Sequence, residues 1–215
     1  MTDSSSPRQQ LLNLIAQESF KLGDFTLSSG AKSDYYIDCR TTTLHAEGAR
    51  LTARVFFDEI QRQGWKPQAI GGLTMGADPI AATVAMLSAQ TIQTRIPAHV
   101  KGADLEEYYI HAFLVRKAEK AHGTGRRIEG FHKKGARVVI VDDVCTTGGS
   151  TIQAMEAARE YGFELAGIMC LVERQEFDGR AAIEKAAGTA RFVSMFTANE
   201  VKAEHLRLFP NGTKS

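Results

Sequence analysis

The chain lacks the features that mark secreted, membrane-spanning and metal-binding proteins. It has only three cysteines, Cys39, Cys145 and Cys170, and no two of them have C-x-x-C spacing. We therefore interpret them as reduced thiols, not as a disulfide framework or a zinc site. No segment is apolar for long enough to span a bilayer, and residues 1–8 are polar, without the apolar core of a signal peptide. These absences predict a cytoplasmic protein with no membrane association.

The chain also lacks an excess of charge of either sign. Lysine and arginine number 26 against 25 acidic residues, a formal net charge of +1. A general nucleic-acid binder would normally carry a strongly basic face, so the balance favours a small-molecule ligand. The sequence contains neither G-x-x-x-x-G-K-[ST] nor H-E-x-x-H, which argues against an ordinary P-loop NTPase and against a zinc protease. With 215 residues, 43% of them hydrophobic, the chain is long enough for one sizeable α/β domain.

What is present centres on the stretch from Arg137 to Thr151. Val138–Val141 is an aliphatic run without polar alternation, as in a strand buried on both faces of a parallel sheet. We expect this strand to end at Asp142 and Asp143, because burying unpaired carboxylates is costly and open α/β sheets bind ligands at this edge. The threonines, glycines and serine that follow, directly before a helical pattern, predict an anion site.

A phosphate fits this site, since unpaired amides and the helix dipole both point at a ligand there. Two adjacent carboxylates would repel a bare nucleotide, so the ligand must bring hydroxyl groups, a cation or both. A ribose phosphate bound with magnesium meets this need. The alternative is that the aspartates only cap the next helix, although a cap needs only one acid.

The stretch resembles the sugar-diphosphate signature of the type I phosphoribosyltransferases. The resemblance implies their fold, a central parallel sheet flanked by helices with a small N-terminal hood. It also implies that the two acids hold the ribose hydroxyls, touching Mg²⁺ only through water, and that the loop wraps the 5-phosphate of 5-phospho-α-D-ribose 1-diphosphate (PRPP). The residues implied to bind PRPP here are Asp142, Asp143, Val144, Cys145, Thr146, Thr147, Gly148, Gly149 and Ser150.

The segment from Gly23 to Arg40 contains two short β-like pieces joined by a turn of small residues. It could be a plain hairpin. Its F-x-L-S-S-G, Lys-Ser pair, aromatic pair and acid resemble the hood of the orotate phosphoribosyltransferases, which lies over the pyrimidine. The resemblance implies that Tyr35 and Tyr36 wall the base, together with Thr146. Ser28, Ser29 and Lys32 are possible donors, and Lys32 or Arg40 could replace the lysine that some members carry at the position of Ser28.

The basic run from Arg116 to Arg127 has no apolar face, and such a run is usually a solvated surface loop. Its order resembles the R-K-x-x-K-x-H-G catalytic loop of the same family. The resemblance implies a homodimer in which this loop folds over the partner's site, with Arg116, Lys117, Lys120 and His122 reaching the diphosphate. A mobile basic flap would exclude water from a reactive sugar cation.

Two further segments leave their interpretation open. The turn from Gly71 to Pro79 is either a second phosphate loop, without the lysine that many family members have there, or a tight turn for close helix–sheet packing. Arg174 follows a predicted strand, Glu164–Val172, and could pair with a carboxylate bidentately. The resemblance assigns it to the carboxylate of orotate, and the alternative is a surface ion pair with Glu173 or Glu176.

The patterns together predict one phosphoribosyltransferase domain, with an arm and hood over about residues 1–45 and a core over about 46–200. The resemblance implies transfer of the phosphoribosyl group from PRPP to orotate through an oxocarbenium-like transition state, without a covalent nucleophile. Lys120, Asp142, Asp143, Arg116 and His122 are the implied catalytic residues. A transferase for another base, or a nucleotide-sensing regulator on the same fold, are the alternatives. The remaining patterns predict helices up to about residue 21 and at 47–63, 77–88, 179–187 and 200–208, and strands at 68–73, 107–115 and 191–196.

Overall fold

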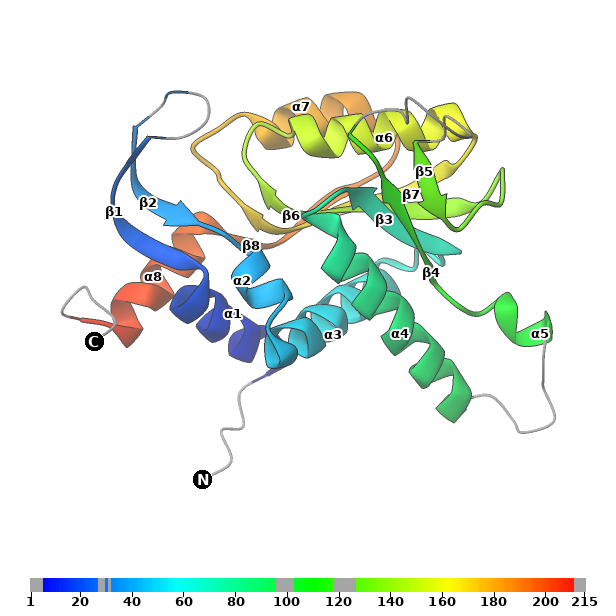
Figure 1. The fold of residues 1–215 in the computed structure, drawn as a ribbon, viewed down its shortest axis with the longest axis horizontal. Coiled ribbons are helices and arrows are strands. Elements are labelled where there is room, and N and C mark those ends of the chain that lie inside the picture. Colours follow the sequence, from blue (N-terminus) through cyan, green and yellow to red (C-terminus); the bar gives the residue numbers. More distant parts are fainter. Residues whose placement is uncertain (1–5, 27–29, 31, 96–102, 118–126, 211–215) are drawn as a thin grey trace.

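The computed structural model describes residues 6–26, 30, 32–95, 103–117 and 127–210. Its centre is a six-stranded sheet with the order β5-β4-β3-β6-β7-β8, shown in Figure 1. The strands are β3 (Ala69–Leu73), β4 (His111–Val115), β5 (Ile128–Gly130), β6 (Arg137–Cys145), β7 (Glu164–Glu173) and β8 (Phe192–Thr197). All neighbouring pairs are parallel except β4 with β5. The predicted α/β fold is therefore confirmed, with one antiparallel strand at the edge.

Helices cover both faces of this sheet. The helices of the described residues are α1 (Pro7–Glu18), α2 (Arg40–Thr43), α3 (Ala46–Gln63), α4 (Ala77–Arg95), α5 (Ala103–Glu106), α6 (Gly149–Tyr161), α7 (Gly179–Ala187) and α8 (Ala198–Leu208). In Figure 1, α6 and α7 lie on one face, and α1, α3, α4 and α8 lie on the other. Each face has its own cluster of buried side chains, as expected for a sheet whose strands are apolar on both sides.

The central strand β6 follows from its sequence. Val138–Val141 is buried because parallel neighbours pair on both sides and helices cover both faces. The prediction that the strand ends at the aspartates is wrong. β6 continues through Asp142 and Asp143 to Cys145, since Asp142 pairs with Cys170 and Cys145 with Glu173 of β7. Helix α6 begins four residues later, after Gly148 turns the chain with a φ of 78°.

The N-terminal part forms an arm and a two-stranded sheet. The hydroxyl of Ser6 caps α1, and Pro7 occupies its first turn, as the sequence predicts. The antiparallel strands β1 (Phe20–Thr26) and β2 (Lys32–Ile37) follow, and we call this pair the hood. His205 of α8 holds the arm in place, since its Nδ1 lies 2.7 Å from the carbonyl oxygen of Ala16.

Several elements differ from expectation in their bounds or were not predicted. The strand predicted at 107–115 begins only at His111, and the one-turn helix α5 precedes it. Strand β5 and helix α2 have three and four residues, too few for any periodicity to appear. Helix α4 runs seven residues beyond the predicted Ser88, to Arg95. Among the described helices, none is both long and apolar enough to cross a bilayer.

Candidate functional site

A cavity of about 740 Å³ lies where the carboxyl ends of β3, β6 and β7 meet the hood. Open α/β sheets bind ligands at this edge, so its position agrees with the prediction. The side chains and backbone that line it come from several separate parts of the sequence. They are Thr26, Tyr36, Ile37, Asp38 and Arg40; Leu73, Thr74, Met75 and Gly76; Lys117; and Asp142, Asp143, Val144, Thr146, Thr147, Ser150 and Arg174.

Asp142 and Asp143 form the floor of this cavity. Asp142 is only 6% exposed; its Oδ1 accepts the amide of Asp143 at 3.0 Å, and its Oδ2 accepts the hydroxyl of Thr151 at 3.0 Å. Asp143 Oδ1 accepts the amide of Val144 at 2.9 Å. Among the described residues neither carboxylate forms an ion pair with a lysine or arginine, and Gly148, not an aspartate, occupies the N-cap of α6. The helix-capping alternative is therefore wrong.

Burial sets the protonation of this pair. Loss of solvation, and then the charge of Asp143, raise the pKa of Asp142 well above the usual range of a carboxyl group. Burial likewise raises the pKa of Asp143, although hydrogen bonds and the charge of Arg40 oppose the change. The two acids are thus held close together without a cation from the described residues. A ligand that brings hydroxyl groups or a cation would stabilise their ionised form.

The loop after β6 presents a polar rim. Thr146, Thr147 and Ser150 line the cavity, at the N-terminus of α6 where amides and the helix dipole favour an anion. Cys145 does not line it, since its side chain is buried. The glycines of the loop serve packing as well: a Cβ on Gly148 would lie 2.9 Å from Ile183 and 3.0 Å from the carbonyl oxygen of Gly179 on α7.

The residues of the turn from Gly71 to Pro79 have two different roles. A Cβ on Gly71 would lie 2.1 Å from the carbonyl oxygen of Phe113, and one on Gly72 would lie 2.0 Å from that of Val141, so both glycines serve close packing of β3 against its neighbours. The following residues, from Leu73 to Gly76, line the cavity. Gly76 is required there, because its Cβ would lie 2.3 Å from Asp143 Oδ1. The turn therefore both packs the sheet and borders the cavity.

The basic loop is described only at its two ends, at Arg116, Lys117 and Arg127. Lys117 lines the cavity, whereas the guanidinium of Arg116 lies 3.4 Å from Glu129 on β5 and is not among the lining groups. The predicted Lys120 and His122 lie outside the described residues. Lys117 is thus the residue of the predicted four that the structure brings to the site.

The hood contributes differently from prediction. Tyr36 is 40% exposed and lines the cavity, but Tyr35 is buried and turns toward Arg174 and Glu176, so it does not wall the cavity as we expected. Lys32 does not line the cavity, although it donates to the hydroxyl of Thr26, which does, at 2.8 Å. Ser28 and Ser29 lie outside the described residues. Arg40 does line the cavity, although Asp38 binds its guanidinium at 2.7 and 2.8 Å.

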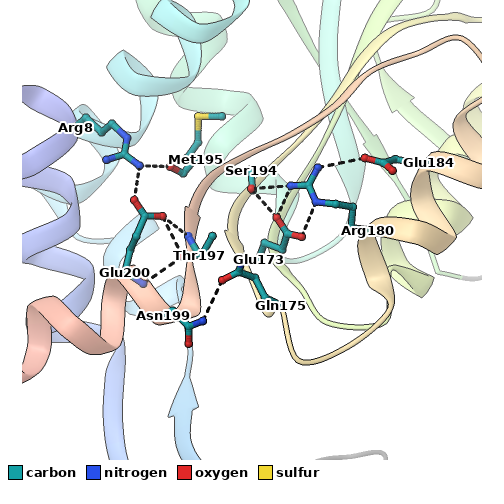
Figure 2. Close-up of polar contacts among 10 residues, drawn as sticks. All are labelled: Arg8, Glu173, Gln175, Arg180, Glu184, Ser194, Met195, Thr197, Asn199 and Glu200. Carbon is teal, nitrogen blue, oxygen red and sulfur yellow. Dashed lines mark hydrogen bonds and ion pairs between the residues drawn. The ribbon is translucent and has the colours of Figure 1, made fainter.

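Arg174 lines the cavity but is only 5% exposed. It pairs with Glu176 at 2.8 Å, so the ion-pair alternative is correct in its partner but not in its surface position. Glu173 does not pair with it. Figure 2 shows instead that Glu173 binds Arg180 of α7 through both carboxylate oxygens, while Ser194 of β8 donates to the same carboxylate at 2.7 Å.

Several residues of the site are absent from the sequence-based prediction. Thr151 lies in the small-residue stretch but is not among the predicted site residues; its hydroxyl donates to Asp142 Oδ2. Gly76 could be found only as one glycine among several. The lining residues Thr26, Ile37 and Asp38 surround the predicted tyrosines, and proximity to them was the available signal.

Comparisons with known proteins agree with this geometry. Residues 41–188 match the family model of the phosphoribosyl transferase domain. The chain is 46% identical over 167 residues to the orotate phosphoribosyltransferase of Streptomyces avermitilis, covering 78% of this chain and 82% of the relative. It is 38% identical to that of Bradyrhizobium sp. ORS 278, with 91% and 97% covered. The crystal structure of the Mycobacterium tuberculosis H37Rv orotate phosphoribosyltransferase in complex with PRPP superposes with a TM-score of 0.68 at 30% identity, with 92% and 99% covered.

Proposed function

The chain belongs to the orotate phosphoribosyltransferases, and from this membership we infer how its cavity works. Like its relatives, it transfers the phosphoribosyl group of PRPP to orotate in pyrimidine biosynthesis, giving orotidine 5-phosphate and diphosphate. The observation that carries the residue assignments is the pair of adjacent acids, Asp142 buried and Asp143 half-buried, which form no ion pair with any described residue and lie directly before the polar loop at the start of α6.

We propose that Asp142 and Asp143 hold the ribose hydroxyls while the loop from Val144 to Ser150 binds the 5-phosphate. Carboxylates accept hydrogen bonds from hydroxyl groups, and the amides at the start of α6 donate to phosphate. Cys145, Gly148 and Gly149 would then act through backbone, since Cys145 is buried and Gly148 packs against α7. As diphosphate leaves C1 of the ribose, the two carboxylates would favour the positive charge that develops on the sugar.

The base would lie between Tyr36 and Arg174, the aromatic ring giving a wall and the guanidinium binding the orotate carboxylate. Thr146 lies on the same wall of the cavity. We assign the diphosphate to Arg116, Lys117, Lys120 and His122 of the basic loop. Lys117 already lines the cavity, which supports this assignment.

Magnesium fits the chemistry of this site. No group of three or more His, Cys, Asp or Glu side chains in the described part of the chain could hold a metal ion directly. The adjacent carboxylates of Asp142 and Asp143 are hard oxygen donors, suited to the water ligands that Mg²⁺ keeps in proteins. When bound, the ion would neutralise charge on the diphosphate.

We further propose a cytoplasmic homodimer in which Lys117 lines the cavity of its own subunit and the rest of the basic loop reaches into the partner's cavity. Met75 borders the cavity and is 64% exposed, and Met86 on the following helix α4 is 54% exposed. Large apolar side chains such as these are more favourable when a partner covers them than when they are exposed to water. Within each subunit, the arm and hood of residues 1–45 would lie over the core of residues 46–200.

The activity is tested by following the loss of orotate absorbance with PRPP and Mg²⁺, and with each omitted. The shared site is tested by mixing Lys120→Ala chains with Asp143→Asn chains. If the loop acts across the interface, mixed dimers contain one intact site and regain activity that neither parent has. Absence of recovery in dimers shown to have exchanged subunits would contradict the shared site. Lys120→Ala itself should reduce turnover far more than stability, because a run without an apolar face contributes little to the core.

A further inference from the structure

Arg174 is held along one edge by protein groups from two distant parts of the chain. Its Nε donates to the hydroxyl of Tyr35 at 3.2 Å and to Glu176 Oε1 at 3.0 Å. Its Nη2 donates to the hydroxyl of Ser33 at 3.0 Å and lies 2.8 Å from Glu176 Oε1. Ser33 and Tyr35 belong to β2 of the hood, about 140 residues earlier in the sequence. The guanidinium is therefore held by the hood as well as by Glu176 in the turn that follows β7.

Two aromatic rings also pack against the guanidinium of Arg174. The centre of the guanidinium lies 4.5 Å from the ring of Tyr35 and 5.1 Å from that of Phe177. Tyr35 is itself stacked on Phe20, with ring centres 5.3 Å apart and planes inclined by 17°. Such packing restricts rotation of the long arginine side chain, so its conformational entropy is lost on folding, not on ligand binding.

The edge of the Arg174 guanidinium that carries Nη1 remains available to a ligand. No described residue accepts a hydrogen bond from Nη1 of Arg174, although the side chain borders the cavity. An arginine presents five N–H donors in a rigid plane, so holding Nε and Nη2 fixes where Nη1 points. A planar carboxylate could bind there without breaking the contacts already made.

Tyr35 keeps its hydroxyl proton in this arrangement. Burial and the hydrogen bond to Glu176 raise the pKa of Tyr35, so the hydroxyl stays neutral and donates to Glu176 while it accepts from Arg174. The hydrogen bonds from Tyr35 and Arg174, aided by the charge of Arg174, outweigh the effect of burial and lower the pKa of Glu176. Glu176 therefore remains a charged acceptor at neutral pH.

We propose that Ser33, Tyr35, Glu176 and Phe177, which we call the Arg174 cage, position Arg174 so that Nη1 meets the carboxylate of orotate. The proposal rests on the function assigned to Arg174 above and adds the residues that act through it. They are positioning residues, since none of the four is required to touch the substrate. The cage also gives Tyr35 a role different from that of its neighbour Tyr36, which borders the cavity.

The cage is tested by removing its polar groups singly and measuring KM for both substrates. Tyr35→Phe keeps the ring and removes only the hydroxyl, and it should raise KM for orotate about fivefold, the equivalent of one net hydrogen bond. Ser33→Ala should act similarly. Glu176→Ala should raise it more, by about tenfold or above, because Arg174 loses a charged acceptor, whereas Glu176→Gln keeps an acceptor and should recover part of the loss. KM for PRPP should stay within about twofold in all four.

Matched controls come from elsewhere in the chain. Tyr161→Phe removes a half-buried hydroxyl, and Glu204→Gln removes the charge of a buried acid that pairs with Arg207. Neither should change KM for orotate. Equal rises of both KM values in the cage variants would show a merely structural role and overturn the proposal.

Arg174→Ala separates the failure of the cage from the failure of the assigned function. A large rise in KM for orotate in Arg174→Ala, with unchanged values in Tyr35→Phe and Glu176→Ala, would refute the cage and leave Arg174 in place. An unchanged KM for orotate in Arg174→Ala would remove Arg174 from substrate binding and the cage with it. Isothermal titration of orotate into each variant, in the presence of diphosphate and Mg²⁺, checks that KM reports binding.

Discussion

The ends of β6 and β7 lie side by side in one sheet, and both carry a buried acid, but the two acids are in opposite electrostatic states. Asp142 and Glu173 are 6% and 5% exposed. Burial and the neighbouring Asp143 raise the pKa of Asp142. Burial acts on Glu173 too, but the hydrogen bonds and charge of Arg180, with the bond from Ser194, outweigh it and lower its pKa (Figure 2).

The difference distinguishes the two acids to which we assign ligand binding from the acid that stabilises the packing of α7 on the sheet. Glu173 forms an ion pair with Arg180 of α7 and accepts a hydrogen bond from Ser194 of β8. It therefore joins α7 to β7 and β8. Asp142 and Asp143 have hydrogen bonds but no ion pair among the described residues, so their ionisation remains unfavourable until a ligand stabilises it. Strained or destabilised groups of this kind are expected where a protein binds or reacts.

The largest effect should come from Asp142→Asn. Turnover should fall by about 10²–10³-fold, the range seen when one group that stabilises transition-state charge is removed. Stability should rise at pH 8 by at least about 1 kcal/mol, since one unit of pKa shift corresponds to about 1.4 kcal/mol. The gain should vanish below about pH 4, where the carboxyl group is protonated in both the folded and unfolded chain. Steady-state kinetics and urea unfolding at both pH values measure the two effects, and destabilisation at pH 8 would contradict the assigned state of Asp142.

The same chemical change on the neighbouring strand should act in the opposite sense. Glu173→Gln should destabilise the protein by about 2 kcal/mol at pH 7, less than the 3–5 kcal/mol of a fully buried pair because the side chain of Arg180 is 41% exposed. Because the folded pKa of Glu173 is lowered, the stability it contributes is present above its unfolded pKa and is lost as the pH falls through the folded value. Thermal unfolding from pH 3 to 8 should show the gap between variant and parent closing at low pH; a constant gap would point to packing, not charge.

A smaller effect should follow from Thr151→Val, which keeps the shape of the side chain and removes the hydroxyl that Asp142 accepts. We expect about 1 kcal/mol of lost stability at pH 8 and about a tenfold loss of turnover. The acidic limb of the pH–rate profile should move upward, because the Thr151 bond lowers the pKa of Asp142. Thr151→Ser retains a hydroxyl and should restore most of both. Parent-like behaviour of Thr151→Val together with losses in Thr151→Ser would show that the methyl group, not the hydroxyl, is what matters.

Sequence patterns predicted the sheet and the polar loop because both depend on local composition. The aliphatic run Val138–Val141 is typical of a buried strand, and the glycines and hydroxyl residues before a helical pattern predict a polar loop at a helix N-terminus, whose binding of an anion stays a prediction. Helix α7 was predicted with its bounds, Gly179–Ala187. Strand β5 was missed because three residues carry no period, and β6 was predicted too short because backbone pairing with β7 outweighs the tendency of acids to avoid a sheet.

Side-chain partners were harder to predict because they depend on elements far apart in the sequence. Arg174 and Glu173 are adjacent in the chain, but Glu173 is the last residue of β7 and Arg174 already lies outside the strand, so one meets Arg180 and the other meets Ser33 and Tyr35. Nothing local distinguishes Tyr35 from Tyr36, for the same reason.

The contact of Gly148 and Gly179 has a consequence for altering the ligand of this protein. A methyl group on Gly179 would lie 2.2 Å from the carbonyl oxygen of Thr146, and one on Gly148 would meet Ile183, so the loop after β6, to which we assign the 5-phosphate, and the first turn of α7 are packed against each other with no spare room. To bind a bulkier sugar phosphate in this loop, both segments would have to be redesigned together. The redesign would have to begin with α7, not with the loop residues that line the cavity.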